Sequence, residues 1–391
     1  MFEYFPGNYM WSLAVNRCLA AGGLLGEIHW ACGDLHDASR SGARGDAEAW
    51  HSAWLVLARQ VEGHATEFAR SGSAVSAAQT FLRASQYYQW AEAFLPPDDA
   101  RASTTFDRHL STFAHAAEFM DPPVEIIEIP FEESYLTAYH LPARNAGIAS
   151  PAVILSDGLD GTKEEMFYVA RALSERGIAC LAVDQPGQGA TLRLAGLPAR
   201  HDSEVATSAA YDYLVGNFDV DPRRIGLCGA SMGGYYAPRA VAFEKRIKAC
   251  VAWSAVYDYR GVWLRRLNVV PGQPVSLDAG AALGTTGSHL LRILGVADFD
   301  EALDKLGAFR LEDVADRISC DILLVHGESD AQMPLPDAEA LFAAIGSDSK
   351  ELRVYTQAEG GASHVQLDRP EPALSRIADW FVRKLGEGSQ S

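Results

Sequence analysis

Residues 224–234 read RIGLCGASMGG, an apolar run that enters a turn of small residues and is followed by a helical pattern. The turn has the form G-x-S-x-G, with Ser231 at its centre. A serine in a tight turn between a strand and a helix projects its hydroxyl above the sheet edge, and small neighbours let the two elements pass closely. The stretch therefore predicts Ser231 as a nucleophile and the Met232 amide as an oxyanion donor at the helix N-terminus, with a simple tight turn as the alternative.

A serine hydroxyl needs a base, and the base needs an acid that orients it. The apolar run ILLVHGESD ends at Asp330, and His364 follows in the small-residue loop GGASH. The order along the chain is therefore serine, acid, histidine, and we predict that Ser231, Asp330 and His364 form a catalytic triad. Glu328 is the competing acid, and His326 is expected to pack or hydrogen-bond locally. The alternatives are a turn or helix-cap role for Asp330 and a surface-loop histidine at 364.

A second oxyanion donor is expected from the loop SDGLDG, which begins where the apolar run of residues 152–155 stops. The amide of Leu159 is the candidate donor, and a plain glycine-rich turn is the alternative. Gly158 lets the backbone approach a ligand closely, and Gly158 and Tyr257 are predicted to line the substrate site. The turn DQPGQG at residues 184–189 is expected to shape the site without taking part in the chemistry.

The chain changes character near Asp121. Before it, apolar residues recur at helical spacing, and no strand-like alternation occurs before Val124. After it, short apolar runs alternate with helical patterns, which is typical of a mostly parallel sheet covered by helices on both faces. We predict an all-helical domain at residues 1–122 and an α/β domain at residues 123–391, with an insertion at about 256–310. The expected strands are 124–131, 135–140, 152–155, 178–183, 224–228, 249–253, 322–325 and 352–355, and the expected helices are 46–70, 73–94, 100–120 and 370–385.

Charge and composition exclude several classes of partner. The 391 residues hold 33 Lys and Arg against 51 Asp and Glu, a formal net charge of −18 that repels phosphate backbones and anionic lipid. No run of about 18 apolar residues occurs, and the start has no basic region ahead of an apolar core. We therefore expect a cytoplasmic protein that binds neither nucleic acid nor membrane.

Metal and cofactor motifs are not found in the sequence. The eleven histidines form no H-x-H or H-E-x-x-H pattern, and the six cysteines form no C-x-x-C pair. The glycine-rich turns lack the dinucleotide fingerprint and the Walker lysine. We predict no metal and no cofactor, and a small molecule as the substrate.

The ordered set formed by GASMG, Asp330 and His364, together with the turn DQPGQG, resembles the α/β-hydrolase fold over roughly residues 124–388. The helical N-terminal part and the stretch DGLDGTKEE at residues 157–165 resemble a narrower subgroup. This subgroup includes 2,6-dihydroxypseudooxynicotine hydrolase, fungal polyketide-shortening hydrolases and fermentation–respiration switch esterase-like proteins. The resemblance implies a mostly parallel eight-stranded sheet, a helical domain that caps the active site, and a homodimer. Some members use an extra acidic residue near the nucleophile, and Asp258 is the nearest candidate here.

The combined expectation is a serine hydrolase that cleaves a carbon–carbon bond next to a ketone, or an ester, in a small aromatic or polyketide-like substrate. Whether an acyl-enzyme forms or water attacks directly is left open by the sequence. The alternatives are a carboxylesterase, an amidase or short-peptide peptidase, and, from another class, a non-hydrolytic binding or cyclising protein with the same fold.

Overall fold

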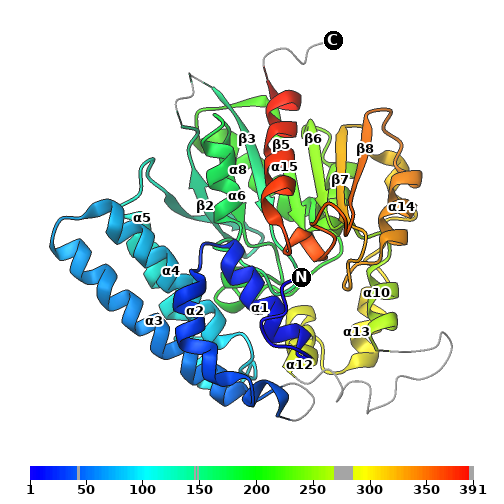
Figure 1. Ribbon diagram of the computed structural model, residues 1–391. Coiled ribbons are helices and arrows are strands. Elements are labelled where there is room, and N and C mark those ends of the chain that lie inside the picture. The colour runs from blue at the N-terminus through cyan, green and yellow to red at the C-terminus, as the bar shows by residue number, and fades with distance from the viewer. Residues whose placement is uncertain (42–44, 145–146, 148, 268–284, 387–391) are drawn as a thin grey trace. The chain divides into compact units, whose positions relative to one another are not determined.

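The computed structural model (Figure 1) describes residues 1–41, 45–144, 147, 149–267 and 285–386. Contacts divide the chain into two compact units. The first comprises Met1–Glu125 and Gly280–His289, of which residues 285–289 are described, and the second comprises Ile126–Ala279 and Leu290–Ser391. The predicted insertion at about 256–310 contains residues 268–284, which lie outside the described residues.

The first unit is helical, as its apolar periodicity predicts. Its core is built from large aromatic side chains, among them Trp11, Trp50, Trp54 and Tyr87, none more than 1% exposed. The indole of Trp50 donates a hydrogen bond to the carbonyl of Trp90 over 2.7 Å, so this buried ring also satisfies its polar atom. The helices are α1 (Tyr9–Ala20), α2 (Leu25–Cys32), α3 (Ala47–Arg70), α4 (Ala74–Glu92) and α5 (Ala100–Ala117).

The second unit is built on one eight-stranded sheet with the order β1-β2-β4-β3-β5-β6-β7-β8. Strand β2 pairs antiparallel with β4, and the pairs from β4 through to β8 are parallel. The carboxyl ends of the parallel strands therefore lie at one edge of the sheet, which is where ligands bind in such folds. The strands are β1 (Glu125–Phe131), β2 (Ser134–Leu141), β3 (Ser150–Ser156), β4 (Ala179–Val183), β5 (Val220–Ala230), β6 (Ala249–Trp253), β7 (Asp321–Gly327) and β8 (Lys350–Tyr355).

Helices connect these strands, as expected for parallel pairs that need crossovers. They are α6 (Phe167–Ser174), α7 (Gly189–Arg193), α8 (Ser203–Asn217), α9 (Gly233–Phe243), α10 (Tyr259–Arg266), α13 (Phe299–Leu306) and α14 (Leu335–Ala344), and α15 (Pro370–Leu385) follows the last strand. A further helix, α12 (Thr285–Leu294), crosses the boundary between the two units. No helix that the structure describes is both long and apolar enough to cross a membrane.

The predicted fold class is confirmed, and each predicted strand overlaps an observed one. Most boundaries agree to within two residues, and two differ by more. Helix α5 ends at Ala117 instead of Met120, ahead of the consecutive prolines 122 and 123, which disfavour helix in the residues before them. Strand β5 begins at Val220, because Val220 pairs with Ser150 at the start of β3. The register then shifts over the polar residues 221–224 before Ile225 pairs with Ala152.

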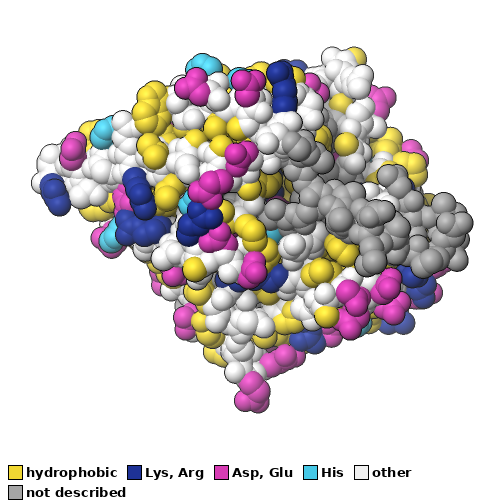
Figure 2. Space-filling view, turned by 90° about the horizontal axis from the view of Figure 1, so that it is seen from below, with side chains coloured by type: hydrophobic (Ala, Val, Ile, Leu, Met, Phe, Trp, Pro, Cys, Tyr) yellow, Lys and Arg dark blue, Asp and Glu magenta, His cyan; other side chains and the backbone are white. Residues whose placement is uncertain are grey.

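The face drawn in Figure 2 carries acidic side chains scattered among Lys and Arg. On this face the acidic excess of the sequence therefore does not gather into a single patch.

A buried ion cluster joins the loop after β3 to the end of β4. The Nζ atom of Lys163 lies 2.9 Å from both a Glu164 and an Asp184 carboxylate oxygen, and all three side chains are at most 3% exposed. Burial lowers the pKa of Lys163, but the two carboxylates outweigh that effect and the net shift is upward. The backbone N–H of Lys163 also donates to Asp184 over 2.7 Å.

We predict that Lys163→Met lowers the free energy of unfolding by about 3–5 kcal/mol, because it leaves two buried carboxylates without their cation. Denaturant unfolding monitored by circular dichroism measures the loss. The matched control is Arg171→Ala, which removes an exposed ion pair with Glu175 and is expected to change the free energy by less than about 1 kcal/mol. Equal losses of unfolding free energy in the two variants would contradict a larger contribution of the buried cluster to stability.

Candidate active site

Ser231 lies between β5 and α9. Its φ angle of 57° is in the left-handed region, which residues other than glycine rarely adopt. Its backbone N–H donates to the carbonyl of Trp253 at the end of β6 over 2.8 Å. The flanking glycines allow the turn, because a Cβ at Gly229 would lie 2.0 Å from the carbonyl oxygen of Gly233. The side chain of Ser231 is half-buried, so the turn presents its hydroxyl at the carboxyl edge of the sheet.

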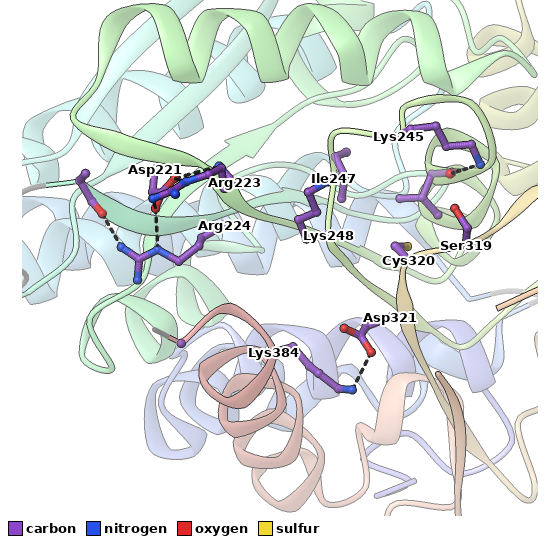
Figure 3. Close-up of a pocket in the computed structure, with 13 residues that line it drawn as sticks. Asp221, Arg223, Arg224, Lys245, Ile247, Lys248, Ser319, Cys320, Asp321 and Lys384 are labelled. Carbon is purple, nitrogen blue, oxygen red and sulfur yellow. Dashed lines mark hydrogen bonds and ion pairs between the residues drawn. The ribbon is translucent and has the colours of Figure 1, made fainter. Parts of the chain in front are cut away.

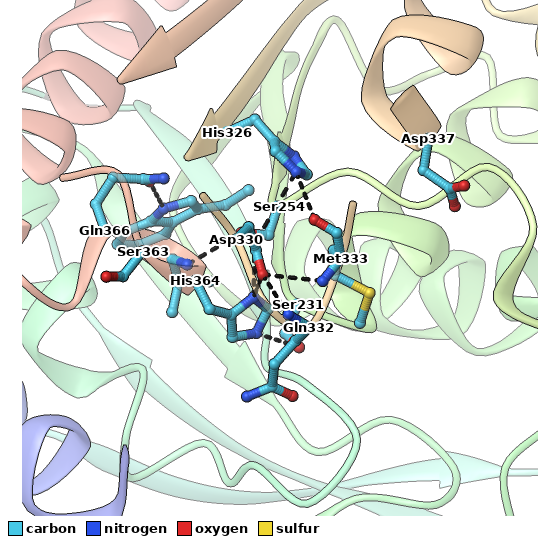
Figure 4. Close-up of polar contacts among 12 residues, drawn as sticks. Ser231, Ser254, His326, Asp330, Gln332, Met333, Asp337, Ser363, His364 and Gln366 are labelled. Atoms are coloured by element: carbon cyan, nitrogen blue, oxygen red, sulfur yellow. Dashed lines mark hydrogen bonds and ion pairs between the residues drawn. The ribbon is translucent and has the colours of Figure 1, made fainter. Parts of the chain in front are cut away.

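The structure brings the three predicted triad residues into one chain of hydrogen bonds (Figure 4). The His364 Nε2 atom lies 2.9 Å from Ser231 Oγ, and His364 Nδ1 lies 2.8 Å from Asp330 Oδ2. Because the carboxylate accepts, the proton of the ring sits on Nδ1, which leaves Nε2 to accept from the serine hydroxyl. This arrangement can remove a proton from Ser231.

Asp330 is 8% exposed and receives four donors. Its Oδ1 atom accepts from the backbone N–H groups of Gln332 and Met333 over 2.8 and 2.9 Å, and Oδ2 accepts from Ser254 Oγ over 2.9 Å. Burial raises the pKa of Asp330, but the charge of His364 and the hydrogen bonds outweigh it and hold the pKa at about 2. The carboxylate is therefore ionised at neutral pH.

Ser254 is a buried neighbour of the candidate site that the sequence reasoning missed. It directly follows β6, is fully buried, and has a φ angle of 60°. Its hydroxyl donates to Asp330 and accepts from the backbone N–H of Val365 over 3.0 Å, so it ties the acid to the residue after His364. The signal that could have found it is its position, since this serine follows the carboxyl end of β6, the strand that pairs with β5 ahead of Ser231.

The two candidate oxyanion donors belong to segments that adjoin Ser231. Met232 follows Ser231 directly, and the loop after β3 approaches so closely that a Cβ at Gly158 would lie 3.1 Å from Ser231 Oγ. The N–H of Gly158 is taken by the Asp157 carboxylate over 2.7 Å. Among the residues that the structure describes, the amides of Leu159 and Met232 donate to no acceptor. Both stay available for a ligand oxygen.

Comparison with known proteins decides the family. A family model described as FrsA-like esterase matches residues 41–268, more than half of the chain. The chain belongs to the FrsA-like esterase family.

Individual relatives agree with this family. The chain is 29% identical, over 94% of its own length and 94% of the relative's, to the hydrolase acrC of Aspergillus aculeatus. It is 32% identical, over 60% of its length and 59% of the relative's, to the 20-hydroxy-prefusarin hydrolase FUS2 of Gibberella moniliformis. The crystal structure of 2,6-dihydroxy-pseudo-oxynicotine hydrolase aligns with a TM-score of 0.79 at 25% identity, covering 96% of this chain and 97% of that one. The predicted resemblance is confirmed, and the chain is an α/β-hydrolase enzyme.

The other acidic and histidine candidates have local roles. Glu328 is exposed and accepts from the backbone N–H of Gln357 over 3.0 Å; no hydrogen bond joins it to His364 in the described part of the chain. His326 donates to the carbonyl of Met333 over 2.8 Å, as predicted, and burial lowers its pKa.

Asp258 and Tyr257 lie just beyond β6. The Asp258 carboxylate is exposed and caps α10 by accepting from the N–H of Gly261 over 3.1 Å. The N–H of Tyr257 donates to Asp337 over 3.2 Å. No hydrogen bond between described residues joins either one to Ser231, Asp330 or His364. Their roles as auxiliary acid and substrate contact stay predictions.

A cavity of about 850 Å³ lies at the opposite edge of the sheet (Figure 3). It is lined by residues at the amino ends of β5, β6 and β7, among them Asp221, Lys248 and Asp321. Lys384 from the end of α15 pairs with Asp321 over 2.6 Å. Because Ser231, Asp330 and His364 follow the carboxyl ends of strands, this cavity is separate from the candidate active site.

The low pKa of Asp330 predicts an acid-dependent stability. A folded pKa of about 2 lies below the unfolded value of about 3.9, so the ionised carboxylate stabilises the fold above about pH 4 and loses that effect as the pH falls toward 2. About 1 kcal/mol is lost by pH 3. Between pH 5 and pH 3 the thermal midpoint of the wild type should therefore fall more than that of Asp330→Asn, as measured by differential scanning calorimetry.

The matched control is Glu328→Gln, which removes an exposed acid from the same turn. Between pH 5 and pH 3 its thermal midpoint should fall by as much as that of the wild type. Parallel curves for the wild type and Asp330→Asn would contradict an ionised, stabilising Asp330.

Proposed function

We propose that this chain is a serine hydrolase that cleaves a carbon–carbon bond next to a ketone in a small aromatic or polyketide-like molecule. The observation that carries the proposal is the continuous hydrogen-bonded chain from Asp330 through His364 to Ser231, with 2.9 Å between His364 Nε2 and Ser231 Oγ. A serine hydroxyl in this setting is activated for attack on a carbonyl.

The mechanism follows from the positions of the atoms. His364 takes the proton of Ser231 as Oγ attacks the carbonyl carbon, and the amides of Met232 and Leu159 hold the resulting oxyanion, each worth about 3–4 kcal/mol of barrier. The tetrahedral intermediate then expels its leaving group, and His364 returns the proton to it. In a β-diketone the bond that breaks joins the acyl carbon to the α-carbon, and the proton goes to the stabilised carbanion. Water activated by His364 then clears the acyl-enzyme.

The substrate class is supported by relatives. One is named a 20-hydroxy-prefusarin hydrolase, and a solved structure aligned at 25% identity is a 2,6-dihydroxy-pseudo-oxynicotine hydrolase. A carboxylesterase is the second candidate, favoured by the matched family model, which is described as an esterase. The same proton from His364 would then go to an alkoxide oxygen.

A fluorophosphonate probe is expected to label Ser231 within minutes at neutral pH, because the probe reports a serine activated by its base. Peptide mass spectrometry locates the label, which Ser231→Ala should abolish. Ser329→Ala, which changes an exposed serine beside Asp330, is the control and should label like the wild type. A folded wild-type protein that is not labelled at Ser231 would contradict the proposed function.

Asp330→Asn is expected to lower kcat by about 10⁴-fold on whichever substrate the wild type turns over, because an amide favours the wrong tautomer of His364. The assay uses a panel of β-diketones, acylphenols, p-nitrophenyl esters and anilides. Faster turnover of a β-diketone than of esters with the same acyl group supports the carbon–carbon hydrolase, and the reverse order supports the carboxylesterase. A loss in Asp330→Asn below about tenfold would contradict the triad.

A further inference from the structure

The side chain of Gln188 lies in the turn between β4 and α7, 1% exposed, and reaches back to the loop after β3. Its Nε2 atom donates to the carbonyl oxygen of Asp157 over 2.5 Å and to that of Gly158 over 2.7 Å. Its Oε1 atom accepts from the backbone N–H of Gln185 over 3.0 Å. The side-chain amide of Gln188 therefore donates both of its hydrogens to two consecutive carbonyls of the loop that faces Ser231.

These two bonds set the direction of the next amide. In a trans peptide the C=O of one residue and the N–H of the following residue point in opposite directions. Because the carbonyl of Gly158 faces Gln188, the N–H of Leu159 faces away from Gln188. Gly158 itself lies against Ser231, and in the described part of the chain the Leu159 amide has no acceptor.

The loop gains from such a restraint because Gly158 is permissive. Gly158 has no Cβ, so on its side no side chain opposes rotation of the peptide that joins residues 158 and 159, and only Leu159 resists it sterically. Rotation by about half a turn would present the carbonyl oxygen of Gly158, in place of the Leu159 N–H, to the nucleophile side. A carbonyl oxygen there would repel the negative charge that develops on the substrate oxygen.

The turn that carries Gln188 is itself rigid. The Asp184 carboxylate accepts from the N–H of Ala190 over 2.8 Å and from Lys163, and a Cβ at Gly189 would lie 2.3 Å from the same carboxylate. The Gln188 amide is therefore anchored at its backbone as well as at its tip.

We infer that Gln188 is a positioning residue for the oxyanion hole: it holds the peptide between Gly158 and Leu159 so that the Leu159 amide is left for the oxyanion. This inference rests on the proposed function, because it assigns a purpose to a donor of that same site.

The first test is Gln188→Met, which keeps length and burial but has no donor. Expected is a fall in kcat for p-nitrophenyl acetate of about 10²-fold, with KM changed by less than about threefold, because the lost stabilisation belongs to the transition state. The inhibition constant of phenylboronic acid, which forms a tetrahedral adduct with an active serine, should rise in parallel with the fall in kcat. Circular dichroism checks that the variant is folded.

The matched control is Gln185→Met. This side chain is a second buried amide on the same turn, and its polar atoms bond to no residue that the structure describes. Its kcat should stay within about threefold of the wild type. An equal loss in both variants would overturn the inference, since the loss would then come from disturbing the turn.

Gln188→Glu supplies a readout that a merely structural role would not move, and it serves if the methionine variant does not fold. An ionised carboxylate repels the two carbonyls, whereas a protonated one can donate to either of them. The ratio of its kcat to that of the wild type should rise as the pH falls from 8 to 5.5. A flat ratio, or wild-type kcat and boronate inhibition in Gln188→Met, would overturn the inference.

Failure of the inference differs visibly from failure of the proposed function. If the wild type hydrolyses the ester, Ser231→Ala does not, and Gln188→Met behaves as the wild type, only the role of Gln188 is overturned. If the wild type neither hydrolyses the ester nor reacts with a fluorophosphonate at Ser231, the proposed function and the inference are both overturned.

Discussion

The φ angle of 57° at Ser231 is the constraint on which the rest of the site depends. A non-glycine residue holds such an angle only when its surroundings determine it, and here three elements do so. The Ser231 N–H bonds to the carbonyl of Trp253, Gly229 and Gly233 meet without Cβ atoms, and the loop after β3 lies against both the serine and the start of α9. A side chain at Gly229 would push β5 and α9 apart, and one at Gly233 would meet the backbone oxygens of Ser156 and Asp157 after β3.

Electrostatics reinforces this geometry. Asp330 is a nearly buried ion in a chain with an acidic excess, and it is tolerated because two backbone amides, the Ser254 hydroxyl and His364 all donate to it. The same bonds fix the ring of His364 with Nε2 directed at Ser231. Ser254 adds a link to the backbone after His364, so acid and base are held by one buried contact as well as by each other. Neither depends on a flexible surface side chain for its position.

The features of this site that lie within one short segment could be predicted from the sequence. The strand–turn–helix around Ser231, the turn at Asp330 and the small-residue loop at His364 are each visible within about ten residues, and the chain order joined them. Contacts between distant segments were not predictable in this way. Ser254 meets Asp330 across 76 residues and Gln188 meets the carbonyl of Gly158 across 30, and no local pattern marks a polar side chain whose partner lies so far along the chain. Asp258 is a case in which a local contact was not predicted. Its position just beyond β6 suggested an auxiliary acid, whereas its carboxylate accepts from the N–H of Gly261 and caps α10.

The most direct test of the account is a crystal structure of the protein soaked with phenylboronic acid. We predict a bond from boron to Ser231 Oγ, with one boron-bound oxygen within about 3.1 Å of the backbone nitrogens of both Met232 and Leu159. An adduct whose oxygens reach neither amide, or boron bound at another residue, would contradict it.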